Sequence, residues 1–298
     1  MNLLFTGASG FLGINILELL RQRYLITTVG LTAIDNIQCN IAEEIPELSE
    51  KYDIVLHAAG KAHSVPKTEA ESKVFFDVNL QGTKHLCAAL ENTGLPKSFI
   101  FISTVAVYGI ETGENITEDY PLNGTGPYAL SKIQAEQFLK EWCGINNVTL
   151  TILRPSLIAG PNPPGNLGAM IKGISTGKYL SIGGGKARKS VLMVQDIANL
   201  IPLVADKGGV YNVCDSQHPS FHELEELICR QLNKSGVISV PFCVAKLLAN
   251  VGDLLGKYAP INSDKLYKIT KSLTFSNEKA GSTLGWEPLS VLDNFRIK

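Results

Sequence analysis

The amino-acid sequence predicts an α/β fold, a doubly wound parallel sheet of the Rossmann type with a smaller C-terminal substrate lobe. Short apolar runs alternate with longer helical patterns through the first half of the chain, as they do in βαβ units. A glycine-rich turn between Thr6 and Gly13 follows the first apolar run and opens the first helical pattern. Together these two features are typical of a dinucleotide-binding domain.

The first half of the chain is expected to alternate strands with helices. The runs Ile54–Leu56 and Phe99–Ile102 are apolar at every position, as central strands of a parallel sheet are. We predict strands at Asn2–Phe5, Tyr24–Val29, Asp53–His57, Ser98–Ser103 and Val148–Leu153, and helices at Phe11–Arg21, Ala70–Asn92 and Tyr128–Trp142.

The second half of the chain is less regular. Strands are predicted at Val191–Val194 and Gly209–Val213, both as candidates to return to the main sheet. The capping box from Ser220 to Glu223 predicts a helix from Phe221 to about Leu232. We therefore expect a dinucleotide-binding domain of residues 1–156 plus about 190–215, and a substrate lobe of about 157–189 plus 216–298.

Composition and charge exclude several classes of protein. The chain has 298 residues, of which 45% are hydrophobic and 18% charged, with a formal net charge of −1. Because no overall basic field exists, we expect a protein that binds neither nucleic acid nor a membrane. The six cysteines form no C-x-x-C pair and are expected to be buried free thiols of a reducing compartment, so we expect a cytoplasmic protein. The apolar stretch Val240–Leu255 is interrupted by polar residues and is too short to span a bilayer. We interpret it as an amphipathic core helix.

The glycine-rich turn has the spacing G-x-x-G-x-x-G, with Gly7, Gly10 and Gly13. Glycines there allow a tight bend, approach of a pyrophosphate and close packing of helix on strand, while the helix N-terminus attracts the phosphates. The second strand ends in Val29-Gly30-Leu31, without the acid that binds an adenosine ribose or an Arg for a 2′-phosphate. We expect NAD or NADP as cofactor, with NAD favoured.

Tyr128 and Lys132 are four residues apart and share one face of a predicted helix. A nearby ammonium favours the phenolate, so the pair suits a general acid–base that takes a proton from a carbinol as hydride leaves for the cofactor. Thr104, at the end of an apolar strand, would orient the same carbinol oxygen. Tyr267 and Lys271 repeat the spacing without such a partner, and we predict that they are not catalytic.

These motifs together resemble the extended short-chain dehydrogenase/reductase family, which includes nucleotide-sugar epimerases and reductases. The resemblance covers nearly the whole chain. It rests on the glycine-rich turn, Leu56-His57-Ala58-Ala59-Gly60, Asn79-Leu-Gln-Gly82-Thr83, Ile102 to Gly109, Tyr128 to Lys132, Arg154-Pro155 and Leu284-Gly285-Trp286-Glu287-Pro288.

The resemblance also implies which residues act. Thr104, Tyr128 and Lys132 would be catalytic, and the family's architecture implies a homodimer. The cofactor would be bound by Gly7, Gly10, Phe11, Leu12, Gly13, Asn40, Ile41, Ala58, Ala59, Gly60, Asn79, Tyr128, Lys132 and Pro155. A nucleotide-sugar substrate would be bound by His63, Thr104, Asn166, Leu167, Arg188 and Lys189. The last two belong to the densest basic cluster of the chain, which suits a diphosphate.

Two departures from the family bear on the reaction. Val105-Ala106 follows Thr104 where sugar 4,6-dehydratases have Asp-Glu, so an acid–base for dehydration is absent. Leu157 stands where UDP-galactose 4-epimerase has Asn. With Arg154-Pro155 and His63, the pattern is more similar to the N-acetylated-sugar branch of bacterial surface-polysaccharide synthesis. We expect a 4-epimerase or a 4-keto reductase of a UDP-N-acetylhexosamine type of substrate.

Two other functions stay open at this point. An NADP-dependent reductase of a sterol- or flavonoid-like carbonyl would leave the basic cluster without a role. A non-catalytic dinucleotide-binding regulator would not need an activated phenol. No metal site is predicted, because His218 and His222 would not share a helix face and have no evident third ligand.

Overall fold

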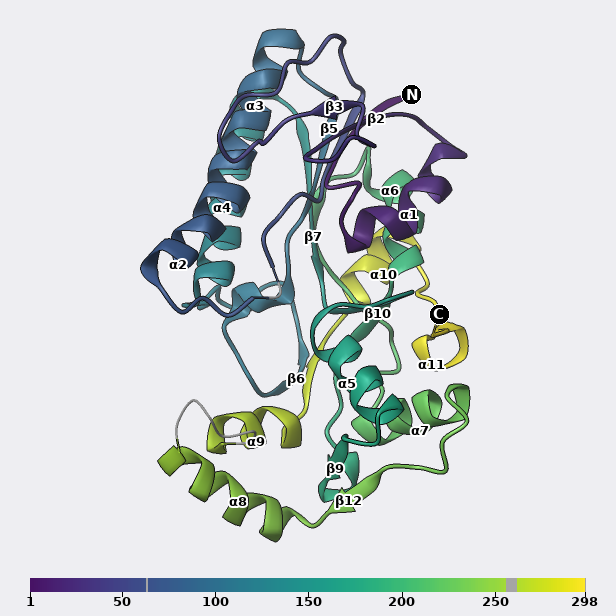
Figure 1. Ribbon diagram of the computed structural model, residues 1–298. Helices are drawn as coiled ribbons and strands as arrows, with labels where there is room; N and C mark the ends of the chain where they lie inside the picture. The colour runs from purple at the N-terminus through teal and green to yellow at the C-terminus, as the bar shows by residue number, and fades with distance from the viewer. Residues whose placement is uncertain (63, 256–261, 298) are drawn as a thin grey trace.

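A parallel sheet forms the upper part of the molecule in the computed structural model, which describes residues 1–62, 64–255 and 262–297 (Figure 1). In this part of the chain, seven strands lie in the order β11-β7-β5-β4-β1-β2-β3, and every neighbouring pair is parallel. The strands are β1 Asn2–Thr6, β2 Leu25–Gly30, β3 Ile37–Gln38, β4 Ile54–His57, β5 Ser98–Ile102, β7 Thr149–Pro155 and β11 Gly209–Val213. This order confirms the predicted Rossmann-type sheet.

Helices cover both faces of the sheet, because its strands are apolar on both sides. Leu3 and Phe5 of β1 belong to the core shared with one helical layer, whereas Leu4 between them belongs to the core on the other face. The first layer contains α1 Phe11–Arg21, α6 Val194–Val204 and α10 Glu278–Leu284 (Figure 1). The second contains α3 Gly82–Thr93 and α4 Pro127–Asn146.

The helix predicted at Ala70–Asn92 is interrupted. The chain forms α2 Glu69–Phe76, a π-helical turn at Asp77–Gln81 and then α3. A π-turn inserts an extra residue without breaking the apolar pattern, so the sequence did not reveal it. The turn contains the fully buried Asn79, one of the residues assigned to the cofactor.

The lower lobe consists of small two-stranded sheets and helices (Figure 1). Its elements are β6 Gly113–Ile116, β8 Leu157–Ala159, α5 Gly165–Ser175, β9 Leu180–Ile182, β10 Val191–Met193, α7 Phe221–Gln231, β12 Ile238–Val240, α8 Phe242–Leu255, α9 Ser263–Thr270, β13 Leu273–Phe275 and α11 Val291–Asn294. Of the two strands expected to rejoin the main sheet, β11 does so. The expectation was wrong for β10, which pairs with β8 because β11 already occupies the free edge of β7.

The helices predicted in this lobe form where expected, but the expected burial of α8 was wrong. Helix α7 begins at the capping box, in which Ser220 and Glu223 cap each other's backbone N–H groups. Helix α8 packs on α9 through Ala245 and Ala249, and its larger apolar side chains are exposed. Small residues let the two helices approach closely, which leaves the bulkier stripe outside. No helix among the described residues is long and apolar enough to cross a membrane.

A buried ion pair fastens α4 to the sheet. Glu136 of α4 accepts hydrogen bonds from Arg154 of β7 at 3.0 and 2.6 Å, and from the Ser103 hydroxyl at 2.5 Å. The Arg154 guanidinium also donates to the Tyr108 hydroxyl at 3.0 Å, and Tyr108 in turn donates to Asn212 of β11 at 2.7 Å. The side chains of Glu136 and Arg154 are 0% and 3% exposed. Each charge is therefore stabilised almost entirely by its partner and these neutral groups.

Replacing Arg154 with Met should lower the free energy of unfolding by about 3–5 kcal/mol, because it leaves the Glu136 carboxylate buried and unpaired. Urea denaturation measures the change. The matched control Lys73→Met breaks the exposed pair of Lys73 and Asp77 and should cost less than about 1 kcal/mol. Equal losses from the two substitutions would contradict the importance given to the buried pair.

Candidate active site

Backbone packing at the glycine-rich turn leaves no room for side chains. Gly7 has φ +81°, and a Cβ added to it would lie 2.6 Å from the backbone nitrogen of Ala59. A Cβ on Gly13 would overlap the backbone of Ala8. The turn therefore lies directly against β4 and α1, whose first residue is Phe11. Close backbone at a helix N-terminus leaves room for a pyrophosphate to approach the N–H groups.

A buried histidine hydrogen-bonds the residue at the start of this turn. His57 of β4 contacts the Thr6 hydroxyl at 2.6 Å and the Thr83 hydroxyl at 2.9 Å through its two ring nitrogens. Burial and the charge of Lys132 lower the pKa of His57 to about 3, so the ring is neutral. The Thr6 hydroxyl also accepts from the backbone N–H of Ala59 at 3.2 Å. The sequence showed His57 only as part of a motif; its role here is to position residues 58–60.

Lys132 is buried at the carboxyl end of the sheet. Its ammonium donates to the carbonyl of Ile102 at 2.9 Å and lies 4.6 Å from the centre of the Phe101 ring. A Cβ added to Gly60 would lie 3.2 Å from Lys132 Nζ and 3.1 Å from Asn79 Oδ1. Three residues assigned to the cofactor, from the loop after β4, the π-turn and α4, thus lie close together.

Asn79 is held in place by hydrogen bonds on both sides of its amide. Its oxygen accepts from the backbone N–H of Lys61 at 2.7 Å, and its nitrogen donates to the Ser131 hydroxyl at 2.9 Å. Ser131 donates to the carbonyl of Tyr128. The amide therefore links the loop after β4 to the first turn of α4.

Tyr128 and Thr104 form a pair at the N-terminal end of α4. The Thr104 side chain hydrogen-bonds the Tyr128 phenol, which lowers its pKa, but burial outweighs this and holds the pKa above its ordinary value. Burial also lowers the pKa of Lys132 to about 8. The expected lowering of the phenol pKa is therefore absent in the protein alone, because Lys132 is directed to Ile102. A positively charged nicotinamide nearby would supply the missing cation.

The end of β2 does carry a carboxylate, contrary to the interpretation of Val29-Gly30-Leu31. The chain turns after Leu31, and Asp35 accepts from the Thr32 hydroxyl at 2.7 Å. An added Cβ on Gly30 would lie 2.5 Å from Asp35 Oδ2. Asp35 thus occupies the space at the strand end that a side chain at residue 30 would take. The sequence did not reveal this because the acid follows the strand by five residues.

The remaining cofactor assignments fall at the edges of the turn and sheet. Asn40 uses its side-chain oxygen to accept from the backbone N–H of Ala42 at 3.3 Å, and Ile41 is buried against Gly82. Pro155 ends β7. Gly10 caps α1, while Phe11 and Leu12 are partly buried in the core under it. His63, assigned to the substrate, lies outside the described residues.

The residues assigned to the diphosphate differ in their surroundings. Asn166 is exposed in the first turn of α5, and Leu167 is buried in the core of the lower lobe. Arg188 donates to the carbonyl of His218 at 2.9 Å and pairs with Glu223 at 3.3 Å. Lys189 interacts instead with the charge of Glu111, in the segment that follows Thr104.

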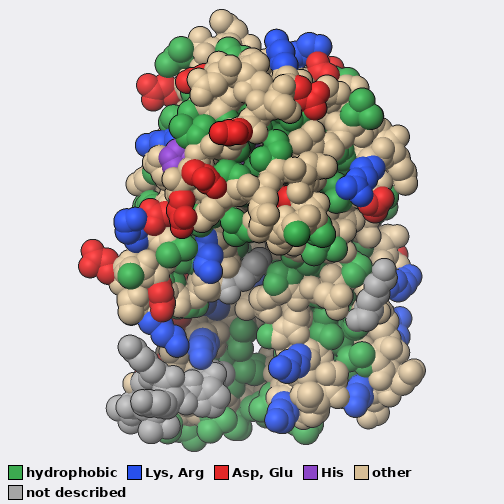
Figure 2. All heavy atoms as spheres, turned by 45° about the horizontal axis from the view of Figure 1, so that its top comes forward, with side chains coloured by type: hydrophobic (Ala, Val, Ile, Leu, Met, Phe, Trp, Pro, Cys, Tyr) green, Lys and Arg blue, Asp and Glu red, His purple; other side chains and the backbone are tan. Residues whose placement is uncertain are grey.

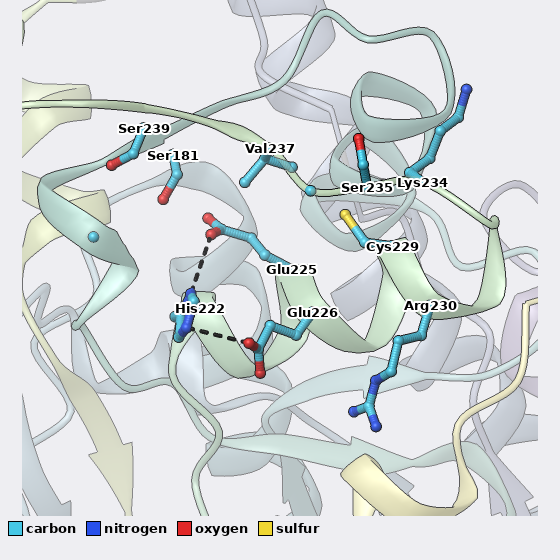
Figure 3. Close-up of a pocket in the computed structure, with 12 residues that line it drawn as sticks. Ser181, His222, Glu225, Glu226, Cys229, Arg230, Lys234, Ser235, Val237 and Ser239 are labelled. Atoms are coloured by element: carbon cyan, nitrogen blue, oxygen red, sulfur yellow. Dashed lines mark ion pairs between the residues drawn. The ribbon is translucent and has the colours of Figure 1, made fainter.

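The lobes enclose a hollow on the face shown in Figure 2, and Lys and Arg side chains lie near its rim. A separate cavity of about 640 Å³ lies within the lower lobe between α7 and the β9–β12 ribbon (Figure 3). There His222 lies 4.0 Å from Glu225 and 3.5 Å from Glu226. Thr104, Tyr128 and Lys132 do not line it, so we do not assign the reaction to it.

The sequence matches a family model and curated relatives. Residues 3–214 match the NAD dependent epimerase/dehydratase family. The chain is 31% identical over 306 residues to N-acetyl-alpha-D-glucosaminyl-diphospho-ditrans,octacis-undecaprenol 4-epimerase of Escherichia coli O157:H7, covering 95% of this chain and 89% of the relative.

Solved structures share the fold. The UDP-glucose 4-epimerase of Thermotoga maritima, determined with UDP-glucose, matches with a TM-score of 0.74 at 21% identity, covering 98% of this chain and 96% of that one. The RMD protein of Pseudomonas aeruginosa complexed with NADPH matches with a TM-score of 0.73 at 22% identity, covering 98% and 94%.

The chain belongs to the NAD-dependent epimerase/dehydratase family. It is an enzyme of the extended short-chain dehydrogenase/reductase type, as the sequence motifs indicated. Its cofactor is a nicotinamide dinucleotide, which fits the glycine-rich turn and the polar groups around Gly60.

Replacing Tyr128 with Phe should lower kcat by about 10²- to 10⁴-fold, because it removes the proton-transferring hydroxyl. Cofactor binding, measured by fluorescence titration, should persist. The control Tyr267→Phe changes a residue that is 42% exposed on α9 and should leave kcat unchanged. Equal losses from the two variants would show that the assignment of Tyr128 is wrong.

The buried Lys132 should make stability depend on pH. Its pKa falls from 10.5 to about 8 on folding, so between these values the unfolded chain binds more protons and stability rises with pH. Relative to Lys132→Met, the wild type should gain about 1 kcal/mol in free energy of unfolding between pH 7 and pH 9. Urea titrations of both proteins at the two pH values measure this. A difference that does not change with pH would mean that Lys132 is not desolvated.

Proposed function

We propose that the protein is a 4-epimerase of an N-acetylhexosamine joined through a diphosphate to a carrier, either a uridine nucleotide or a polyprenol. The observation that carries the proposal is the grouping of Thr104, Tyr128 and Lys132 at the carboxyl edge of the sheet beside the glycine-rich turn. The 31% identity to the Escherichia coli undecaprenol-linked 4-epimerase over 95% of the chain supports this class of substrate.

The three residues have distinct tasks in this proposal. Tyr128 removes the proton of the sugar's 4-hydroxyl and later returns it. Thr104, which is hydrogen-bonded to Tyr128, orients the same oxygen. Lys132 provides a positive charge at the carboxyl end of the sheet, and it would contact the ribose of the cofactor. A bound nicotinamide dinucleotide would supply the reversible hydride transfer at carbon 4, and return of the hydride to the opposite face of the sugar would give the epimer.

The basic segment supplies the binding site proposed for the diphosphate. Residues 165–190 contain five Lys and Arg and no Asp or Glu. Within this segment, Lys189 interacts with Glu111 in the segment after Thr104, whereas Arg188 is already bound to Glu223 and backbone carbonyls. We therefore assign the charge contact with the diphosphate to Lys189, and to Arg188 the orientation of residues 217–223, which it contacts. Lys186 lies on the same segment and is exposed.

We also propose that NAD is preferred to NADP. The Asp35 carboxylate lies at the carboxyl end of β2 beside Gly30, where an acid binds the ribose hydroxyls of NAD. A 2′-phosphate at this place would meet a negative charge and no Arg, since Val29-Gly30-Leu31 offers none.

A 4-keto reductase is the second candidate function. It would use the same three residues and a reduced cofactor that exchanges at every turnover. The specific observation in its favour is the 30% identity over 197 residues to GDP-6-deoxy-D-mannose reductase of Pseudomonas aeruginosa, which spans 61% of this chain. An epimerase differs in keeping its cofactor and needing no external reductant.

Incubation with UDP-N-acetylglucosamine and with its polyprenyl-diphosphate counterpart, with and without NADPH, tests the proposal. We expect interconversion of the gluco and galacto sugars without added reductant, detected by chromatography of the released sugars. Calorimetric titration of NAD and NADP should show tighter binding of NAD. NADPH consumption that requires a 4-keto sugar would establish the reductase instead. No turnover of any diphosphate-linked sugar would overturn the proposal.

A further inference from the structure

The outer surface of α8 is apolar. Val244, Leu247, Leu248 and Val251 are 45%, 66%, 51% and 47% exposed, and their spacing of three and four residues places them on one stripe of the helix. Phe242 adds an exposed ring at the first turn. Helix α8 lies at the lower edge of the molecule (Figure 1). Such a stripe ordinarily faces a core, but here it faces outward.

Helix α8 is attached to the protein by a different face. Ala245 and Ala249 are buried and pack with Leu266 of α9 and with Ile182 and Val240 of the β9–β12 ribbon. The large side chains take no part in this packing, because they lie on the other side of the helix. The exposed stripe is therefore available to a partner outside the lobe.

The neighbouring ribbon also carries two exposed apolar side chains. Leu180 and Ile238 pair across β9 and β12 and are 50% and 68% exposed. They precede Ile182 and Val240 by two residues in their strands, so they lie on the same face of the ribbon as the residues that contact α8. The stripe on α8 alone groups four exposed apolar side chains, whereas ordinary surfaces show such residues singly.

The lobe that carries this surface is strongly basic. Residues 165–190 and 216–275 contain twelve Lys and Arg against five Asp and Glu, although the whole chain has 27 and 28. Figure 2 shows Lys and Arg on the lower lobe with apolar side chains at its lower edge, while Asp and Glu gather on the upper part. An apolar helix face on a lobe with an excess of Lys and Arg matches a bilayer that contains anionic lipids.

Charge also disfavours a second copy of the chain as the partner. Two copies joined through this face would bring two basic lobes together, and like charges in an interface oppose association. Only Asp253 provides an acidic side chain within α8, and it already accepts from Ser263 at the start of α9. An anionic surface has the complementary charge.

We propose that Val244, Leu247, Leu248 and Val251 dock the lower lobe on an anionic lipid bilayer. The apolar side chains would enter the boundary between headgroups and acyl chains, and lysines of the same lobe would meet lipid phosphates. The proposal rests on the proposed function in one respect, since a polyprenyl-linked sugar would be presented at the same surface. It revises the expectation that the protein binds no membrane.

Sedimentation with vesicles tests the proposal on the whole protein. The wild type should bind vesicles that contain phosphatidylglycerol. It should bind less strongly to vesicles of pure phosphatidylcholine, and binding to the anionic vesicles should weaken at high salt. The double substitution Leu247→Glu, Val251→Glu should lower the vesicle-bound fraction at least tenfold. The control Ile14→Glu alters a residue of α1 that is 65% exposed, closely matching Leu247, and should bind like the wild type.

A fluorophore gives a second readout of insertion. Cys243 is exposed on α8, whereas the other five cysteines are buried, so an environment-sensitive label attached there reports on this helix. Its emission should shift to the blue when anionic vesicles are added. Absence of wild-type binding, or equal binding by the double variant, would overturn the proposal. Loss of a dimer in the variant without any vesicle binding would instead identify an interface between copies.

Activity separates this proposal from the proposed function. The double variant should still turn over UDP-N-acetylglucosamine at the wild-type rate, because α8 contributes none of the catalytic residues. A protein that binds vesicles but converts no diphosphate-linked sugar would refute the proposed function and leave the docking surface intact.

Discussion

The buried ion pair between Glu136 and Arg154 holds α4, the helix that carries Tyr128 and Lys132, against the sheet. Glu136 is one turn beyond Lys132 on α4, and Arg154 is near the carboxyl end of β7. Their bidentate contact fixes α4 against the sheet edge, and Ser103 and Tyr108 complete the hydrogen bonding. The negative charge of Glu136 also raises the pKa of Lys132 against the effect of burial. One interaction therefore positions the helix and supports the charge of its functional lysine.

The sequence predicted those parts of the molecule that depend on local pattern. The glycine-rich turn, the alternating strands and helices, and the Tyr128–Lys132 spacing all follow from residues close together in the chain. The structure adds what depends on distant contacts. After a turn, the chain places Asp35 beside Gly30 at the end of β2. Strand β10 pairs with β8 and not with the main sheet, because β11 occupies the free edge of β7. The exposure of α8 was missed because periodicity shows that a helix has an apolar stripe but does not show which side packs.

The two lobes differ in net charge. The net charge of −1 conceals a basic lower lobe and an acidic remainder, so a total near zero describes the charge of neither lobe. The upper lobe provides the glycine-rich turn and the groups proposed for catalysis, and burial is the largest influence on the pKa values of His57, Tyr128 and Lys132. The lower lobe provides the cations proposed for a diphosphate and the apolar stripe proposed for a bilayer. Both proposals depend on the same local excess of Lys and Arg.

The central claim is that the Thr104, Tyr128 and Lys132 site removes hydride from carbon 4 of a sugar and returns it to the same carbon. A UDP-N-acetylhexosamine, or its polyprenyl-linked counterpart, carrying deuterium at carbon 4 tests this directly when the product is analysed by mass spectrometry and NMR. The account predicts that the epimer retains deuterium at carbon 4. Replacement of that deuterium by hydrogen from water would contradict it, because the proton would then have exchanged with solvent and no hydride would have been held in the site.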